Sequence, residues 1–473
     1  MFGLREHAGP ALIDANDDRI LEFSDLVDLA ETSVAEMGST RSLMFLWCEN
    51  TVATVAFYAG ALLRRHAVAL FDAAVQPHLR AGVIDTYRPS WVAGPVGTAA
   101  EMAELGIAVE SVFPVEDAEL VNTGFEGPES IHPDLAVMLS TSGTTGSTKF
   151  VRLTDANIES NARAIAEYLA LTPDERPISS LPLHYTFGLS VLNSHWVAGA
   201  PTVLTGHGLL QQPFWDAFRS NECTSLAGVP FSYLMLERLR FREMDLPSMR
   251  LMIQAGGALD RRLQEVYAKH LESVGGQFFV MYGQTEATAR ISYVPSERLR
   301  DKLGSAGIAI PGGKLSIDTD DGTTTEPGIV GEVVYEGPNV MMGYAEKSED
   351  LARGDELGGV LSTGDLGRLD DEGFLFLTGR SKRIVKAFGL RISLDEVETR
   401  LREHGPAAVV ADGDLIRAFC SFGDNDSLED LRLAMAIEFN VNQAAFAFER
   451  VDTIPTTTSG KIDYRRFERW SET

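Results

Sequence analysis

Short apolar runs alternate with longer segments of helix-like spacing through the first part of the chain. Residues 43–47 form an apolar run, residues 51–65 follow with helical spacing, and residues 67–71 form the next apolar run. Further buried-strand candidates lie at 135–139, 201–204 and 277–281. Strands that alternate with helices are typical of βαβ units, so the pattern predicts a doubly wound α/β body.

The pattern changes near Gly304. Glycine and proline gather at 311–313, Asp321-Gly322 suggests a hairpin turn, and residues 330–335 read as a strand. These features predict a β-rich subdomain at about 304–378. The last part of the chain has a strand and helix pattern of its own, which predicts a small α+β domain. A chain of 473 residues also exceeds the usual size of a single core, about 250–300 residues.

Composition narrows the function classes. The chain is 44% hydrophobic and 23% charged, which is ordinary for a globular enzyme. Its net charge of −27 argues against broad binding to nucleic acid or an anionic membrane. The 3 cysteines are far apart and predict neither a disulfide framework nor a zinc site. Without a signal-like or membrane-spanning apolar run, a cytoplasmic protein is expected.

A loop rich in hydroxyls and glycine follows the candidate strand 135–139. Carboxyl ends of strands are where open α/β sheets bind ligands, and glycine lets backbone N–H groups approach phosphate oxygens. The spacing differs from a GxxxxGK[ST] loop, so a kinase or motor NTPase is disfavoured. A surface loop without function remains an alternative on composition alone. The candidate phosphate ligands are Thr141, Ser142, Gly143, Thr144, Thr145, Gly146 and Lys149.

This loop resembles the signature of the adenylate-forming superfamily, which contains acyl-CoA synthetases, peptide-synthetase adenylation domains and beetle luciferases. Further segments resemble the other motifs of that superfamily in the same order, over roughly residues 10 to 467. They are Tyr282 to Glu286, Gly337 to Tyr344, Ser362 to Asp365, Gly379 to Glu398, and Thr458 to Lys461. The resemblance implies ATP and Mg²⁺ as cofactors.

The residue chemistry agrees with the roles that the resemblance implies. The Tyr282 ring can stack on a purine, Thr285 can bind the α-phosphate, and Glu286 can hold Mg²⁺. Asp365 offers a carboxylate to the ribose, and the resemblance adds Arg380 there. Further expected nucleotide contacts are Gly256, Gly257, Ala258, Gly283 and Gln284.

Lys461 is the expected catalytic lysine, because a carboxylate that attacks the α-phosphate needs a cation to bridge the two anions. The resemblance places a hinge near Arg383, which separates a domain at 1–382 from a mobile lid at 384–473. It also implies that Lys386 and Gly389 face a thiol acceptor.

The segment 181–189 resembles the acyl-pocket motif of the superfamily. Tyr185 stands where amino-acid-activating members have Asp, so an α-amino acid is disfavoured, since its buried ammonium would lack a partner. The expected pocket residues are His184, Tyr185, Phe187, Gly188, Val229, Pro230 and Ala255.

The resemblance therefore predicts an ATP-dependent ligase that activates a carboxylic acid as its acyl-AMP. CoA is the expected acceptor. A carrier-protein pantetheine, an amine, a luciferase-like oxygenase activity and a catalytically inactive adenylate-binding protein remain alternatives. We expect a monomer or a homodimer, and no nucleic-acid or membrane partner.

Overall fold

The computed structural model describes residues 2–140, 149–380, 383–387, 390–412, 415–439, 441–456 and 462–468. Contacts divide the chain into two compact units. The first unit contains Met1–Lys314 and Tyr335–Leu361, and the second contains Leu315–Val334 and Ser362–Thr473. Loop residues 141–146, Gly389 and Lys461 lie outside the described residues.

The first sheet of the first unit runs in the order β19-β9-β8-β4-β3-β5-β7-β6. Strand β3 pairs in parallel with β4 and β5, and β4 pairs in parallel with β8. The strands are β3 (Leu43–Cys48), β4 (Ala67–Asp72), β5 (Trp91–Pro95), β6 (Ser111–Val115), β7 (Ala118–Asn122), β8 (Leu135–Ser140), β9 (Phe150–Thr154) and β19 (Gly343–Ala345).

Both faces of the central strands β3, β4 and β8 are buried, which is why these strands are mostly apolar. Side chains alternate along β3, so Met44 and Leu46 enter one core and Phe45 and Trp47 enter another. Helices α1 and α2 cover the first face, and α3 and α4 cover the second. These helices are α1 (Phe23–Ser33), α2 (Val52–Leu63), α3 (Pro77–Tyr87) and α4 (Thr98–Glu104).

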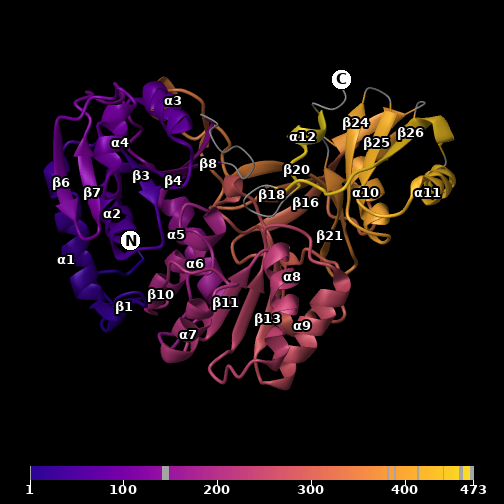
Figure 1. The fold of residues 1–473 in the computed structure, drawn as a ribbon, viewed down its shortest axis with the longest axis horizontal. Coiled ribbons are helices and arrows are strands. Elements are labelled where there is room, and N and C mark those ends of the chain that lie inside the picture. The colour runs from indigo at the N-terminus through magenta and orange to yellow at the C-terminus, as the bar shows by residue number, and fades with distance from the viewer. Residues whose placement is uncertain are drawn as a thin grey trace. The chain divides into compact units, whose positions relative to one another are not determined.

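A second sheet, β11-β12-β13-β14-β15, shares two helices with the first. Helix α5 (Asp155–Tyr168) turns Ile158 toward the core of the first sheet and Ile165 toward the core of the second. Helix α6 (Thr186–Val197) likewise turns Leu192 toward the core of the first sheet and Phe187 toward the core of the second. Figure 1 shows both helices between the sheets, with α8 and α9 on the far side of β13.

The remaining elements of the first unit complete this layered body. A small sheet runs β10-β1-β2. The strands are β1 (Pro10–Asp14), β2 (Arg19–Glu22), β10 (Thr202–Leu204), β11 (Ser225–Gly228), β12 (Leu251–Gln254), β13 (Gln277–Tyr282), β14 (Ser292–Val294) and β15 (Ile308–Ala309), and the helices are α7 (Gln212–Ser220), α8 (Pro230–Arg238) and α9 (Arg261–Ser273).

Most of the sheet β17-β16-β18-β20-β21 lies in the second unit. Its turn is at residues 320–321, because Thr319 pairs with Gly322, so the turn expected at Asp321-Gly322 is shifted by one residue. These strands are β16 (Lys314–Thr319), β17 (Gly322–Thr324), β18 (Gly331–Glu336), β20 (Val360–Leu369) and β21 (Leu375–Arg380).

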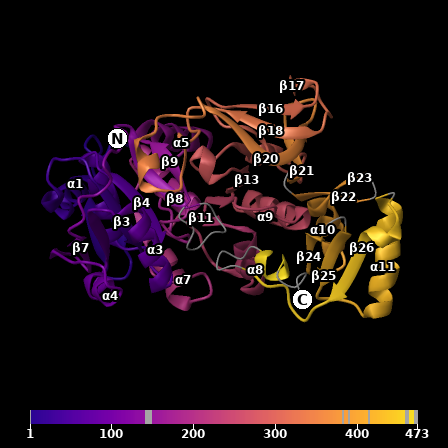
Figure 2. The same ribbon diagram turned by 90° about the horizontal axis from the view of Figure 1, so that it is seen from above.

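The C-terminal part of the second unit has its own core. Helices α10 and α11 pack on one face of the sheet β24-β25-β26, and Phe467 of α12 packs on the other. Figure 2 shows α11 beside β26. The elements are β22 (Ile384–Ala387), β23 (Leu390–Ser393), α10 (Leu394–Arg402), β24 (Ala407–Asp412), β25 (Leu415–Cys420), α11 (Asn425–Glu438), β26 (Phe446–Arg450) and α12 (Arg465–Glu468).

No helix among the described residues is both long and apolar enough to cross a bilayer.

Candidate active site

The segment after β13 turns back on the strand that precedes it. Ile291 N–H donates to the Tyr282 carbonyl at 2.9 Å, and Ala289 N–H donates to the Gln284 carbonyl at 3.2 Å. A Cβ on Gly283 would lie 1.8 Å from the Ala289 carbonyl oxygen. This position therefore requires glycine because the backbone of Ala289 approaches it closely. The motif led us to expect a nucleotide contact at Gly283, which is a different reason for a glycine.

Two consecutive residues of this loop have left-handed backbone. Thr288 has φ 53° and Ala289 has φ 107°, which is strained for residues other than glycine. Asn339 holds them in place, because its side-chain amide donates to the carbonyls of Ala287 and Arg290 at 2.7 and 2.9 Å. Thr288 Oγ1 in turn donates to the Asn339 carbonyl at 2.6 Å. The segment 337–344 therefore clamps the loop that carries Thr285 and Glu286.

Tyr344 links two of the predicted site residues. Its hydroxyl donates to Glu286 Oε1 at 2.8 Å, and Lys149 Nζ lies 3.8 Å from the centre of its ring. Lys149 also pairs with Glu346 at 3.6 Å. Burial, reinforced by the Glu286 carboxylate, raises the pKa of Tyr344, so the phenol stays protonated and remains a donor. A cation and a carboxylate thus meet at one aromatic ring.

The start of α6 lies next to Thr285 and to the carboxyl ends of β11 and β12. The hydroxyls of Thr186 and Thr285 are 3.0 Å apart. A Cβ on Gly256 would lie 2.6 Å from the Tyr185 hydroxyl and 3.1 Å from Val229 Cγ1. Tyr185, Phe187, Val229 and Ala255 belong to one apolar cluster. The structure thus gathers most of the expected acyl-pocket residues, and a Cβ on Gly257 would lie 3.2 Å from Pro230 Cγ.

Two expected pocket residues have other neighbours. His184 Nε2 lies 4.0 Å from Asp72 Oδ2, at the end of β4. Burial lowers the pKa of His184, while Asp72 opposes that shift. A Cβ on Gly188 would lie 2.2 Å from the Pro182 carbonyl, so this glycine lets α6 pack against the preceding segment. Ala258 is exposed.

The second unit carries the expected ribose and hinge residues. Asp365 lies within β20, which continues to Leu369, and its backbone stands opposite that of Arg380 in the antiparallel pairing with β21. It is 5% exposed. Arg383 forms ion pairs with Asp395 and Glu398 and lies 4.1 Å from the centre of the Tyr464 ring. The backbone of Lys386 is in β22.

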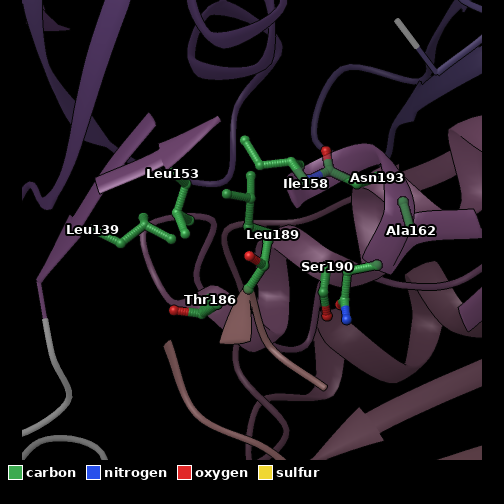
Figure 3. A pocket seen from close by; sticks show the side chains of 10 residues that line it. Leu139, Leu153, Ile158, Ala162, Thr186, Leu189, Ser190 and Asn193 are labelled. Carbon is green, nitrogen blue, oxygen red and sulfur yellow. The ribbon is translucent and has the colours of Figure 1, made fainter. Parts of the chain in front are cut away.

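A small cavity lies between α5 and α6 and is also lined by residues of β8 and β9 (Figure 3). Its volume of about 10 Å³ suits roughly one water molecule and is far too small for an acyl group. Asn161 contributes to its lining, and Asn161 Oδ1 has no hydrogen-bond partner among the described residues.

The donor chemistry suits Mg²⁺ bound together with a nucleotide. Among the described residues, no group of three or more His, Cys, Asp or Glu side chains could hold a metal. Mg²⁺ differs from zinc in this respect, because it usually takes one or two carboxylates and completes its shell with phosphate oxygens and water. Glu286 can supply such a carboxylate.

Sequence patterns missed two residues of this site. Asn339 lies inside the segment 337–344, whose motif does not indicate a clamp, and Arg290, which is 2% exposed, lies outside every motif. A lone arginine in the otherwise uncharged run 287–296 was the available signal for Arg290.

Comparisons with known proteins place this chain among the adenylate-forming enzymes. The chain belongs to the AMP-binding enzyme family, whose model matches residues 35–345. It is 32% identical over 339 residues to the 2-succinylbenzoate–CoA ligase of Bacillus velezensis, covering 70% of this chain and 67% of that protein. It is 31% identical over 357 residues to the medium-chain fatty-acid–CoA ligase of Escherichia coli, covering 72% and 62%.

Solved structures match over nearly the whole chain. MatB from Rhodopseudomonas palustris, bound to ATP, matches with a TM-score of 0.79 and 23% identity, covering 100% of this chain and 98% of that one. O-succinylbenzoate coenzyme A synthetase from Bacillus subtilis, in complex with AMP, matches with a TM-score of 0.78 and 23% identity, covering 98% and 96%. The predicted α/β fold and the predicted family are therefore confirmed.

Proposed function

We propose that this enzyme activates a carboxylic acid as its acyl-AMP, with release of pyrophosphate, and then transfers the acyl group to CoA. The observation that carries the proposal is that Lys149 and Glu286 both contact Tyr344, while the hydroxyl of Thr285, the neighbour of Glu286, lies 3.0 Å from the hydroxyl of Thr186. The proposed phosphate site would thereby adjoin the predicted acyl pocket.

The reaction needs these groups for an electrostatic reason. The attacking carboxylate and the α-phosphate are both anions, so positive charge has to lie where they meet. Glu286 would hold Mg²⁺, Lys149 would contact phosphate oxygens, and the Thr285 hydroxyl would donate to the α-phosphate. Lys461 would bridge the carboxylate and the phosphate during adenylation, as the motif implies.

The known relatives support CoA as the acceptor. Curated relatives are CoA ligases for different acids, among them 2-succinylbenzoate, oxalate and medium-chain fatty acids. A relative of known structure binds a CoA product analogue, and another structure of that synthetase holds ATP and magnesium. The chain spans 52–67% of the length of the first curated relatives, and their acids differ, so the names do not define a substrate.

The proposed reaction is tested by acid-dependent exchange of pyrophosphate into ATP across a panel of carboxylic acids. Exchange with at least one acid is expected, and adding CoA should then give AMP and a thioester. Formation of an amide with added amines would show that the acceptor is an amine. Acylation of a carrier protein in place of CoA would show that the acceptor is a carrier protein. No exchange with any acid would contradict the ligase activity and favour an inactive adenylate-binding protein.

Three variants separate the proposed roles. Lys461→Ala should abolish adenylation, while the protein still binds AMP. Glu286→Gln keeps the side-chain shape but removes the charge, so exchange should require much more Mg²⁺. Tyr344→Phe removes the bond to Glu286 but keeps a ring beside Lys149, so its effect should be smaller than that of Glu286→Gln.

A further inference from the structure

Arg290 is a charged residue in the interior of the first unit. It is 2% exposed and is among the largest fully buried side chains. Its guanidinium carbon lies 4.0 Å from the centre of the Phe187 ring, and Phe187 is one of the residues expected to line the acyl pocket. The Phe187 ring in turn lies 6.3 Å from the ring of Tyr185, another expected pocket residue. The guanidinium therefore lies at the wall of the predicted pocket.

The neighbours of Arg290 leave part of its hydrogen-bonding capacity unused. A guanidinium has five N–H donors. Arg290 Nε donates to the Met281 thioether at 3.2 Å, and Nη1 contacts the Ala289 carbonyl at 3.4 Å. The Tyr168 hydroxyl is the third acceptor. A thioether and a long carbonyl contact are weak acceptors, so five N–H donors share three acceptors, of which only the Tyr168 hydroxyl is of ordinary strength.

Arg290 also lacks a compensating negative charge. None of the acidic residues in the described part of the chain forms an ion pair with it. The groups that raise the pKa of Arg290 are the hydroxyls of Tyr168 and Tyr185. Burial lowers the pKa of Arg290, although a guanidinium stays charged in proteins. Arg152, which is also fully buried, shows the usual arrangement, because it pairs with Glu356 at 2.6 Å.

A buried charge without a partner is costly, so its retention calls for an explanation. The strained backbone at Thr288 and Ala289 directly precedes Arg290 and adds to that cost. Strain of this kind persists where the surrounding structure enforces it, often at ligand sites. Asn339 and Asn161 both donate to the Arg290 carbonyl, at 2.9 and 3.1 Å, and fix its position.

We propose that Arg290 binds a second carboxylate of the acid substrate, so that the enzyme activates a dicarboxylic acid at one end and holds it at the other. Two adjacent residues in the first turn of α6 connect the parts of this site: the Thr186 hydroxyl lies 3.0 Å from that of Thr285, and the Phe187 ring lies 4.0 Å from the Arg290 guanidinium. A planar guanidinium suits two-point binding of a carboxylate. The proposal rests on the acid-activating function above.

Matched pairs of acids test the role of Arg290. Exchange is measured with butanoate and succinate, hexanoate and adipate, and benzoate and isophthalate, for the wild type, Arg290→Met and Arg290→Lys. At least one diacid should exceed its monoacid partner in kcat/KM for the wild type. Arg290→Met should reduce kcat/KM for that diacid by about 30-fold or more, the lower range for losing one partner of a buried charge pair. It should leave the monoacid within about threefold.

Arg290→Lys keeps the charge and should recover part of the diacid preference. Arg163→Met, at an exposed residue of α5 that pairs with Glu159, is the control and should keep the wild-type preference. Thermal unfolding of each variant checks folding. Equal losses for diacid and monoacid in Arg290→Met, or a wild type that prefers the monoacid in every pair, would overturn the proposal.

Calorimetric titration of the same acids without ATP separates this proposal from the ligase function. Diacid binding that weakens in Arg290→Met supports the carboxylate site even if no acid promotes exchange. If exchange occurs but diacids bind equally to the wild type and to Arg290→Met, the ligase function stands and the Arg290 site is refuted.

Discussion

Replacing Asn339 by alanine should release the loop that carries Thr285 and Glu286. Asn339 is 1% exposed. Its side chain accepts from the Tyr335 hydroxyl at 2.7 Å and donates to the carbonyls of Ala287 and Arg290. Alanine removes all three hydrogen bonds, and nothing in the side chain replaces them.

The expected destabilisation follows from these three bonds. Each buried hydrogen bond contributes about 1 kcal/mol net, and groups left without a partner add to the loss, so about 3–5 kcal/mol is expected for Asn339→Ala. With a urea m-value of about 3 kcal/mol/M, the unfolding midpoint should fall by about 1 M or more. Tryptophan fluorescence reports mainly on the first unit, because four of the five tryptophans, Trp47, Trp91, Trp196 and Trp215, lie there.

Activity should fall more than stability alone explains. In the absence of urea the folded variant should lose most of its exchange activity, because Thr288 and Ala289 can relax from their strained backbone and displace Glu286. Asn221→Ala, which removes a partly exposed bond to the Ala217 carbonyl, is the control and should change the midpoint little. If Asn339→Ala unfolds at the wild-type midpoint and keeps exchange within threefold, the clamp is refuted.

Two further changes test other parts of the first unit. Gly283→Ala should abolish exchange, since its Cβ would lie 1.8 Å from the Ala289 carbonyl oxygen. The control is Gly82→Ala in α3, whose Cβ meets no atom within 4 Å and which should be neutral or stabilising. Equal activity of the two variants would contradict this reasoning. Burial lowers the pKa of His195 from 6.5 to about 4, so its contribution to stability is fully present above pH 6.5 and is lost as pH falls toward 4. The loss can reach about 3 kcal/mol, and His195→Asn should lessen this acid sensitivity in urea unfolding curves measured from pH 7 to pH 4.

The sequence predicted the parts of the fold that depend on local pattern. The apolar run 43–47 is β3 and the helical stretch 51–65 contains α2, because each is specified by short-range periodicity. The position of Asp365 was not predictable in this way. Its strand β20 continues through polar residues to Leu369, held by pairing with β21, and such pairing leaves no local signal.

The site likewise contains residues that the sequence predicts and contacts that it does not predict. The motif residues Lys149 and Glu286 could be named from chemistry, but their shared contact with Tyr344 depends on β19 pairing with β9, which brings together residues far apart in sequence. The role of Arg290 is not predictable from the sequence, because it depends on the absence of an acidic partner around a buried guanidinium. Sequence shows that an arginine is present, whereas burial without an acidic partner becomes visible only in three dimensions.

One short loop thus links the two proposals. Thr285 and Glu286 at its start would handle phosphate and Mg²⁺, and Arg290 at its end would hold the distal carboxylate. Between them lie the strained residues Thr288 and Ala289, which Asn339 fixes through both flanking carbonyls. Because the clamp acts on both ends, relaxing it should impair catalysis and diacid selectivity together, whereas Arg290→Met should change selectivity alone. Comparing kcat/KM for diacid and monoacid in the two variants therefore distinguishes positioning of the loop from recognition of the substrate.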